Sequence, residues 1–223
     1  MNNISAALPH PPVALLLDFD GVILQSVQIK IDAFLTIYAD ADDDERAAIL
    51  DYQREHGGVT RRLKFRYIEK HIFGRTIDDA RVEALSDAYT KLVHGAVLAC
   101  PFVPGAEAFL SRVVEHAAMH LVSGTPHDEL IDIVRRRHLE RYFASVHGAP
   151  ETKPDAFAQI LKERGYAPER VLAVGDSTTE FHAGRALGVP FLAIVAANER
   201  SPFPPGIATV PTLEGVAALL GFD

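Results

Sequence analysis

Two aspartates, Asp18 and Asp20, form the arrangement in this sequence that is best suited to chemistry. They follow the apolar run 13–17, and Gly21 comes directly after them. Alternation along an extended chain places both carboxylates on the same side, and glycine lets the chain turn away without a side chain over a ligand. Two carboxylates this close repel each other unless a cation lies between them, and Mg2+ is a hard divalent cation that favours oxygen ligands. The same residues are also compatible with a strand end that carries ordinary turn acids.

Three later segments place polar side chains after short apolar runs. Ser123 and Gly124 stand just before a proline, so a hydroxyl group and free backbone N–H groups would meet the start of a helix. Lys153 precedes a proline that restricts its backbone, and Asp176 and Glu180 stand four residues apart at a strand-to-helix turn. Each segment has a structural alternative, which is helix capping for the serine and the two acids and a solvated loop position for the lysine.

The elements that would hold these residues alternate along the chain. After Pro101, short apolar runs alternate with helical patterns, which is typical of a parallel sheet with helices on both faces. In such a sheet ligands bind at the carboxyl ends of the strands, where the polar segments would meet. We therefore predict an α/β fold with a Rossmann-like parallel sheet as its core. After the first strand at 13–17, the expected strands are 119–122, 143–146, 171–174, 191–195 and 207–210.

Residues 26–100 have a different sequence pattern, with helical periodicity and no sign of strands. Apolar residues recur at helical spacing in four stretches, which predicts four helices. The acidic cluster 42–45 lies where the second helix would begin, and acids there cap a helix and complement its dipole. We expect two domains: an α/β core of residues 1–25 and 101–223, and a small all-helical domain of residues 26–100 inserted after the first strand.

The composition limits the class of protein. The chain has 223 residues, 48% of them hydrophobic, and its net charge of -8 argues against a general nucleic-acid or anionic-membrane surface. No stretch is long and apolar enough to span a bilayer, and residues 1–12 are typical of a loose leader and not of a signal peptide. The single cysteine, Cys100, excludes an internal disulfide and fits a reducing compartment. We expect a cytoplasmic protein, and no feature points to an obligate protein partner.

The polar segments together resemble the four motifs of the haloacid dehalogenase superfamily, in the right order and on the expected elements. The resemblance covers residues 13–195, and the helical insert resembles the C1-type cap of relatives such as phosphoglycolate phosphatase and β-phosphoglucomutase. Glu180 departs from the pattern, because many relatives have aspartate there. The matching residues are Asp18 and Asp20 in the first motif, Ser123 in the second, Lys153 in the third, and Asp176 with Glu180 in the fourth.

The resemblance implies a phosphatase that acts on a small phosphorylated metabolite in two steps. Asp18 would attack phosphorus and form an aspartyl-phosphate. Asp20 would protonate the leaving oxygen and then, once ionised, activate water for the second step. Dehalogenases usually carry a bulky non-acid in place of Asp20, and phosphonatases lack this second aspartate, so phosphate-ester chemistry is favoured.

The resemblance also implies a Mg2+ cofactor and a set of groups that hold the phosphoryl oxygens. Mg2+ would be held by Asp18, the backbone carbonyl of Asp20 and Asp176, with Glu180 binding it directly or through water. The oxygens would be held by Ser123, the Gly124 N–H and Lys153.

Three alternatives to a phosphatase stay open at this point. A phosphomutase would return the phosphoryl group from the aspartate to a second substrate hydroxyl. A receiver-like signalling module also groups acids, a hydroxyl and a lysine around Mg2+, but it holds its phosphoryl group instead of turning it over. The large insert directly after the first motif counts against that module, and the intact acids count against a catalytically silent relative.

Substrate choice would reside largely in the insert, at the segment 56–66. This segment joins a glycine turn to four cations within six residues, and it resembles the substrate-specificity loop of related capped phosphatases. Thr60 and Arg61 are the candidate substrate contacts, Lys64 is a weaker one, and Arg62 and Arg66 are expected at the surface. A solvated helix face with an N-cap threonine would explain the same residues.

Overall fold

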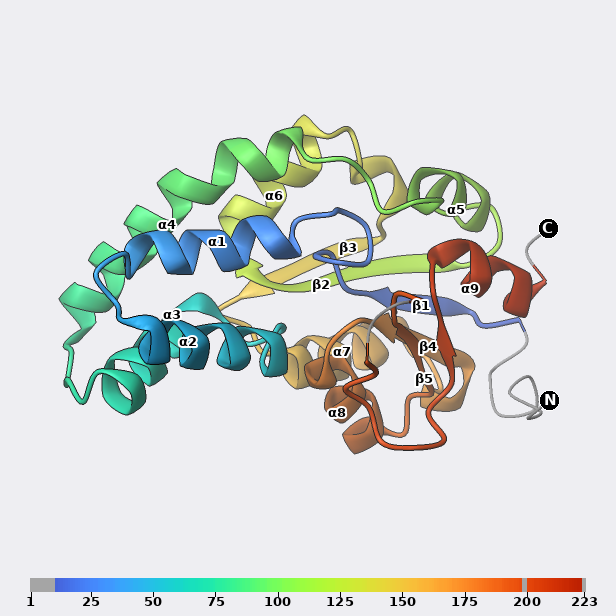
Figure 1. Cartoon of the computed structure of the whole chain (residues 1–223). Helices are drawn as coiled ribbons and strands as arrows, with labels where there is room; N and C mark the ends of the chain where they lie inside the picture. Colours follow the sequence, from blue (N-terminus) through green and yellow to red (C-terminus); the bar gives the residue numbers. More distant parts are fainter. Residues whose placement is uncertain (1–10, 198–199, 222–223) are drawn as a thin grey trace.

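The computed structural model describes residues 11–197 and 200–221, and a six-stranded parallel sheet lies at its centre (Figure 1). The strand order is β3-β2-β1-β4-β5-β6, so the first strand lies inside the sheet. The expected strands are all present, with shifted ends. Their bounds are β1 (Ala14–Leu17), β2 (Ala118–Pro126), β3 (Ser145–Ala149), β4 (Val171–Gly175), β5 (Phe191–Ile194) and β6 (Thr209–Val210).

The apolar run of β1 is continuous because both faces of the sheet are covered. Leu15 and Leu17 belong to the hydrophobic cluster on one face, and Ala14 and Leu16 belong to the cluster on the other. The first face is covered by α5 (Ala106–Val113), α6 (His127–Arg136) and α9 (Leu213–Leu220). The second is covered by α7 (Lys153–Arg164) and α8 (Thr178–Leu187), and Figure 1 shows the two helical layers on opposite sides of the sheet.

The second strand is longer than its apolar pattern predicts. It continues past Val122 because Ser123 still pairs with Gly148 of β3, and Pro126 pairs with Ala149 after a shift in register. The second-motif serine therefore lies on extended backbone inside the strand and not in the turn after it. Short 3-10 turns at Glu140–Tyr142 and Pro168–Arg170 lead into β3 and β4.

The segment between β1 and β2 forms the predicted helices, which lie beyond the carboxyl ends of the strands (Figure 1). Asp42 caps the second of them, since its side chain accepts from the Glu45 N–H while the Glu45 side chain accepts from the Asp42 N–H, both at 2.9 Å. The expected capping role of the acidic cluster is confirmed. The helices are α1 (Val27–Ile37), α2 (Asp43–Glu55), α3 (Arg61–Tyr67) with a π-helical turn at Ile68–Ile72, and α4 (Asp79–Ala99).

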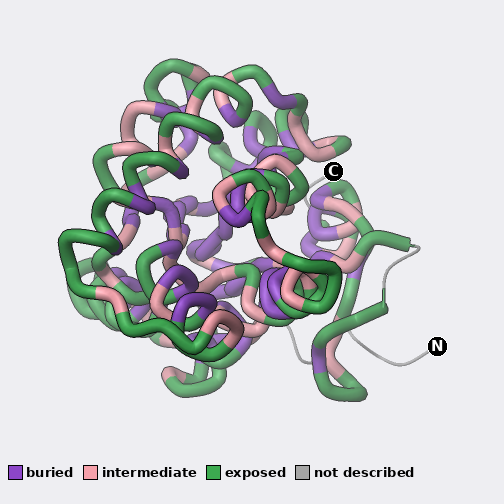
Figure 2. The backbone as a smooth tube through the Cα atoms, turned by 60° about the vertical axis from the view of Figure 1, so that its left-hand side comes forward, coloured by how far each residue is buried: buried purple, intermediate pink, exposed green. Residues whose placement is uncertain are grey.

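The helical segment 26–100, called the insert below, shares its buried apolar residues with the sheet. Phe34, Ile49 and Phe65 of the insert belong to the same hydrophobic cluster as Leu17 and Leu121 of the strands. Figure 2 shows this burial along the backbone, with exposed residues on the outer turns of the helices. Whether the insert is a separate domain stays a prediction. None of the helices in the described ranges has the length and apolarity needed to cross a membrane.

Candidate active site

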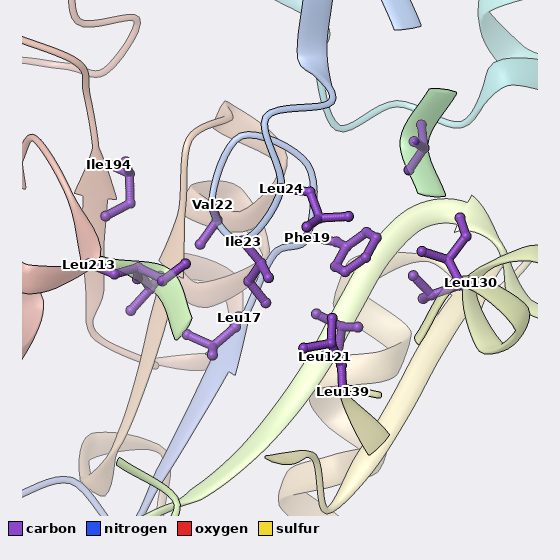
Figure 3. Packing of buried hydrophobic residues seen from close by; sticks show 14 of the residues in the cluster. Leu17, Phe19, Val22, Ile23, Leu24, Leu121, Leu130, Leu139, Ile194 and Leu213 are labelled. Carbon is purple, nitrogen blue, oxygen red and sulfur yellow. The ribbon is translucent and has the colours of Figure 1, made fainter. Parts of the chain in front are cut away.

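The first-motif acids are held by a tightly packed turn after β1. The Asp18 N–H donates to Val174 O at 3.1 Å, which prolongs the pairing of β1 with β4. Phe19 and Leu24 of the turn are fully buried, and Figure 3 shows them beside Leu121 and Leu130 of the core. The apolar side chains between and after the acids therefore anchor the backbone, so the two carboxylates emerge from a rigid support.

Gly21 is required at the bend of this turn. Its φ of +77° lies in the left-handed region, and an added methyl group would collide with the Asp176 carboxylate. The fourth motif therefore lies directly against the first, as expected for the ends of the adjacent strands β1 and β4.

Asp18 lies against a buried ion-pair chain. The Lys153 Nζ is 3.1 Å from Asp18 Oδ1 and also forms an ion pair with Glu180, and all three side chains are at most 6% exposed. Glu180 in turn accepts a hydrogen bond from Ser177 at 2.6 Å. Burial raises the pKa of Asp18, although the nearby Lys153 charge opposes that rise. In this arrangement Glu180 holds the lysine, and its expected part in metal binding stays a prediction.

Asp20 has a different set of partners, supplied mainly by the insert. Its carboxylate accepts from the Ser26 hydroxyl and the Lys30 ammonium, each at 2.5 Å, and more weakly from Thr125 at 3.3 Å and Ser123 at 3.4 Å. Burial by itself would raise the pKa of Asp20, but the Lys30 charge and these hydrogen bonds outweigh it and hold the pKa below its usual range.

The second-motif residues form the wall next to Asp20. Ser123 is 2% exposed, and its hydroxyl accepts from the Thr125 N–H at 3.1 Å. Gly124 lies under the insert, because a Cβ atom there would be only 2.9 Å from Gly58 O. The glycine turn of the insert, Gly57–Gly58, thus approaches the ends of the strands closely.

A cavity of about 470 Å³ separates the strand ends from the insert. The structure brings most of the predicted residues to its wall, while Ser123 and Glu180 lie just behind the wall and Thr60 does not line it. The predicted residues on the wall are Asp18, Asp20, Arg61, Gly124, Lys153 and Asp176.

Arg61 lies in the cavity wall, but its charge is already paired. Its Nη2 is 2.8 Å from both carboxylate oxygens of Glu129 on α6, and its Nη1 donates to the Thr90 hydroxyl at 2.6 Å. The guanidinium also lies over the Tyr89 ring, 4.6 Å from its centre. Thr60, directly before α3, makes no capping hydrogen bond through its side chain.

Two cavity residues were missed or undervalued in the sequence. Lys30 follows Asp20 by ten residues and sits on the first helix of the insert, a position that sequence reasoning did not single out. Lys64, expected to matter less than Arg61, is only 7% exposed, and burial followed by repulsion from Lys30 lowers its pKa to about 7. Arg62 and Arg66 are at the surface, as predicted, and pair with Glu83 and Asp79.

The donor atoms around Asp18 and Asp176 fit Mg2+. Burial, followed by repulsion from Asp18, raises the pKa of Asp176 to about 8, and a divalent cation beside the two acids would keep both ionised. Their carboxylates and the Asp20 carbonyl are hard oxygen donors. Within residues 11–197 and 200–221, no three acidic, histidine or cysteine side chains gather tightly enough to bind a metal by themselves. Water and substrate oxygens would complete the shell, as is usual for Mg2+.

Comparison with known proteins identifies relatives in sequence. The model of a family described as haloacid dehalogenase-like hydrolase matches residues 15–194. Phosphoglycolate phosphatase 1 of Pseudomonas aeruginosa is 26% identical over 191 residues, which cover 80% of this chain and 67% of that protein.

Solved structures share the fold. One is a mutant of CbbY from Rhodobacter sphaeroides in complex with xylulose-(1,5)bisphosphate, with a TM-score of 0.74 and 16% identity over 94% of this chain and 99% of that one. Another is the HAD-hydrolase YfnB from Bacillus subtilis bound to magnesium, with a TM-score of 0.69 and 18% identity, again over 94% of this chain and 99% of that one. The expected α/β class with a Rossmann-like core is confirmed.

The family match begins in β1 and ends in β5, so it takes in all the segments that carry the polar residues described above. The resemblance seen in the four motifs is thereby confirmed, as is the prediction of an enzyme. The chain belongs to the haloacid dehalogenase-like hydrolases.

Proposed function

We propose that this protein is a Mg2+-dependent phosphatase that hydrolyses a small phosphorylated metabolite through an aspartyl-phosphate. One observation carries the proposal: the two acids at the end of β1 have separate partners suited to separate tasks. Asp18 lies beside Lys153 in the buried ion-pair chain, whereas Asp20 is held by Ser26 and Lys30. Two equivalent turn acids would have no need for this division.

In the first step Asp18 is the nucleophile. Lys153 fixes one carboxylate oxygen, and the other oxygen attacks phosphorus as the bond from phosphorus to the leaving oxygen breaks. Asp20 supplies the proton that the leaving oxygen needs. The negative charge of an incoming phosphate favours the protonated form of Asp20, which offsets the effect of Lys30 in the free protein.

In the second step Asp20 is the base. It has lost its proton to the leaving group, and the Lys30 ammonium at 2.5 Å stabilises the resulting carboxylate. The carboxylate takes a proton from water, the water oxygen attacks phosphorus, and the bond between phosphorus and Asp18 breaks to release phosphate.

Other residues of the strand ends would hold the phosphoryl oxygens. Ser123, the Gly124 N–H and Lys153 are the donors, and Glu180 keeps Lys153 in place. Asp18, Asp176 and the Asp20 carbonyl would hold Mg2+, which would offset phosphate charge that otherwise repels the nucleophile.

The size of the cavity supports a small substrate. A volume of about 470 Å³ suits a metabolite, and the insert closes it opposite the strand ends. In this proposal the insert is a cap domain that contacts the leaving group. The single thiol, Cys100, is buried and unpaired, which supports a reducing, cytoplasmic location that cell fractionation would test.

The test is phosphate release from a panel of phosphorylated metabolites, with Mg2+ and with EDTA. We expect turnover by the wild type with Mg2+, none by Asp18→Asn, and normal turnover by Asp87→Asn, which alters an exposed aspartate of α4. Acid quenching during turnover should trap a labelled phosphoenzyme in the wild type and none in Asp18→Asn. Undiminished phosphate release by Asp18→Asn would refute the nucleophile assignment.

The same panel separates the alternatives. A phosphomutase would form isomerised phosphorylated products without stoichiometric free phosphate, which phosphorus NMR detects. A receiver-like module would take up one label per chain and show no turnover. Either result would overturn the phosphatase proposal while the family assignment stands.

A further inference from the structure

The cations of the cavity differ in whether a carboxylate neutralises them. Two of them, Arg54 and Arg200, are exposed to solvent. Three others form ion pairs with buried or partly buried carboxylates: Lys30 with Asp20, Lys153 with Asp18 and Glu180, and Arg61 with Glu129. Lys64 is the remaining cation on the cavity wall within the described ranges. Its hydrogen bonds and ring contact are with neutral groups: it donates to Gln53 Oε1 at 2.8 Å and to Gly57 O at 3.2 Å, and it lies 5.7 Å from the centre of the Phe34 ring.

Gln53, next to Lys64, has an amide nitrogen, Nε2, without a hydrogen-bond acceptor among the residues that the structure describes. It is 3% exposed and lines the cavity. Its orientation is set by Lys64, because an ammonium group has only donors and must face the amide oxygen. The amide nitrogen is therefore a buried donor without an acceptor, which is costly unless a ligand supplies one.

Lys64 and Gln53 lie on the insert side of the cavity, opposite the reacting groups. Lys64 belongs to α3 and Gln53 to α2, and the lysine is close enough to Asp20 and Asp176 for their charges to act on its pKa. When the phosphoryl group of a substrate lies at Asp18, its leaving group would extend into the same cavity, whose wall includes these two side chains.

We propose that Lys64 and Gln53 form the subsite for the leaving group, and that this subsite selects substrates with a second anionic oxygen group, either a carboxylate or a second phosphate. The proposal rests on the phosphatase function above. An anionic group would supply the negative charge that Lys64 lacks and the acceptor that the Gln53 nitrogen lacks. Arg61 is not the anion ligand in this scheme, because both carboxylate oxygens of Glu129 already contact its guanidinium; Arg61 positions α3 instead.

The test uses three substrates of equal chain length with different far ends. They are 3-(phosphonooxy)propanoate, propane-1,3-diol bisphosphate and, as the uncharged reference, propane-1,3-diol monophosphate. We expect the wild type to prefer one or both anionic compounds. Lys64→Met should lower kcat/KM for the preferred compound by about 10- to 100-fold, the range of a charge-assisted hydrogen bond, and change the reference by less than about threefold. Whichever anionic compound loses more identifies the carboxylate or the phosphate as the natural group.

A matched control and a binding measurement complete the test. Arg62→Met removes a neighbouring cation that is 46% exposed and paired with Glu83, and it should leave all three substrates unchanged. Equal loss on all three substrates in Lys64→Met, or no preference in the wild type, would overturn the subsite. Calorimetric titration of the same compounds into Asp18→Asn, with and without Lys64→Met, separates the two proposals. Selective, Lys64-dependent binding without turnover in the wild type would refute the phosphatase and keep the subsite, whereas equal or absent binding of all three would overturn the subsite.

Discussion

Replacing Glu129 with alanine should destabilise the protein strongly, because it leaves the Arg61 guanidinium buried without a counter-charge. The two side chains are 6% and 8% exposed, so water screens the pair very little. Removing one partner of a buried ion pair typically costs about 3–5 kcal/mol. The guanidinium would keep the Thr90 hydroxyl and the Tyr89 ring as neighbours, which favours the lower end of that range, about 3 kcal/mol. A loss of that size corresponds to a fall in Tm of roughly 6–12 °C for a chain of this length.

The assay is urea unfolding of the wild type, Glu129→Ala, Arg61→Ala and the double variant, read as a double-mutant cycle. The matched control is the same cycle for Arg62 and Glu83. This ion pair also involves an arginine of α3, but its two side chains are 46% and 53% exposed. We expect the control pair to couple by at most about 1 kcal/mol, and the Arg61 pair to couple by more. A loss below about 1 kcal/mol in Glu129→Ala would mean that water reaches the guanidinium. The reason for excluding Arg61 from the anion subsite would then fail.

Two further predictions concern single residues. Gly21→Ala should abolish phosphate release and lower stability by more than Gly74→Ala. Both glycines have a positive φ, but a Cβ at Gly21 would meet the Asp176 carboxylate, whereas a Cβ at Gly74 would meet no described atom within 4 Å. Equal effects of the two substitutions in unfolding and activity assays would contradict this explanation. Burial, with smaller contributions from nearby positive groups, lowers the pKa of His120 to about 4, so between pH 6.5 and 4 the unfolded chain binds a proton that the folded chain does not. Stability should be intact above pH 6.5 and fall by about 3 kcal/mol as the pH drops toward 4. His120→Leu should flatten that fall, while the exposed His182→Leu should leave it as steep as in the wild type.

The sheet and the first-motif turn could be predicted because their signals are local. The sequence of β1 is an unbroken apolar run because Leu15 and Leu16 point to opposite faces of the sheet and helices cover both faces. Asp18 follows at the end of this run. The polar residues at the ends of the other strands then fall at the same edge without any knowledge of packing. The end of β2 was misjudged because Ser123 keeps its pairing with β3 through a shift in register, which no apolar pattern reveals.

The partners of the site residues could not be predicted, because they depend on how the insert rests on the sheet. Lys30 meets Asp20 only through the direction in which α1 leaves the turn, and Arg61 meets Glu129 across 68 positions of sequence. The role of Glu180 also depends on a contact that the sequence does not reveal. As an acid in the fourth motif it suggests a metal ligand, but its contact with Lys153 gives it a positioning role that only the packing of α8 against α7 produces.

If Lys64 belongs to the proposed subsite, the contrast between Arg61 and Lys64 explains why counting charges in the segment 56–66 does not identify the residue that contacts the substrate. The two are three residues apart on α3 and therefore share a face of the helix, and both line the cavity. Arg61 reaches a carboxylate on α6, which neutralises it and ties the insert to the core. Lys64 donates to the amide oxygen of Gln53 on α2 and to a backbone carbonyl and meets no carboxylate within the described part of the chain, so its charge is left for a ligand. The arginine, with the stronger donor geometry, is thereby fixed in a structural contact. The lysine, whose pKa near 7 lets an anion draw it into the charged form, is left to respond to the substrate.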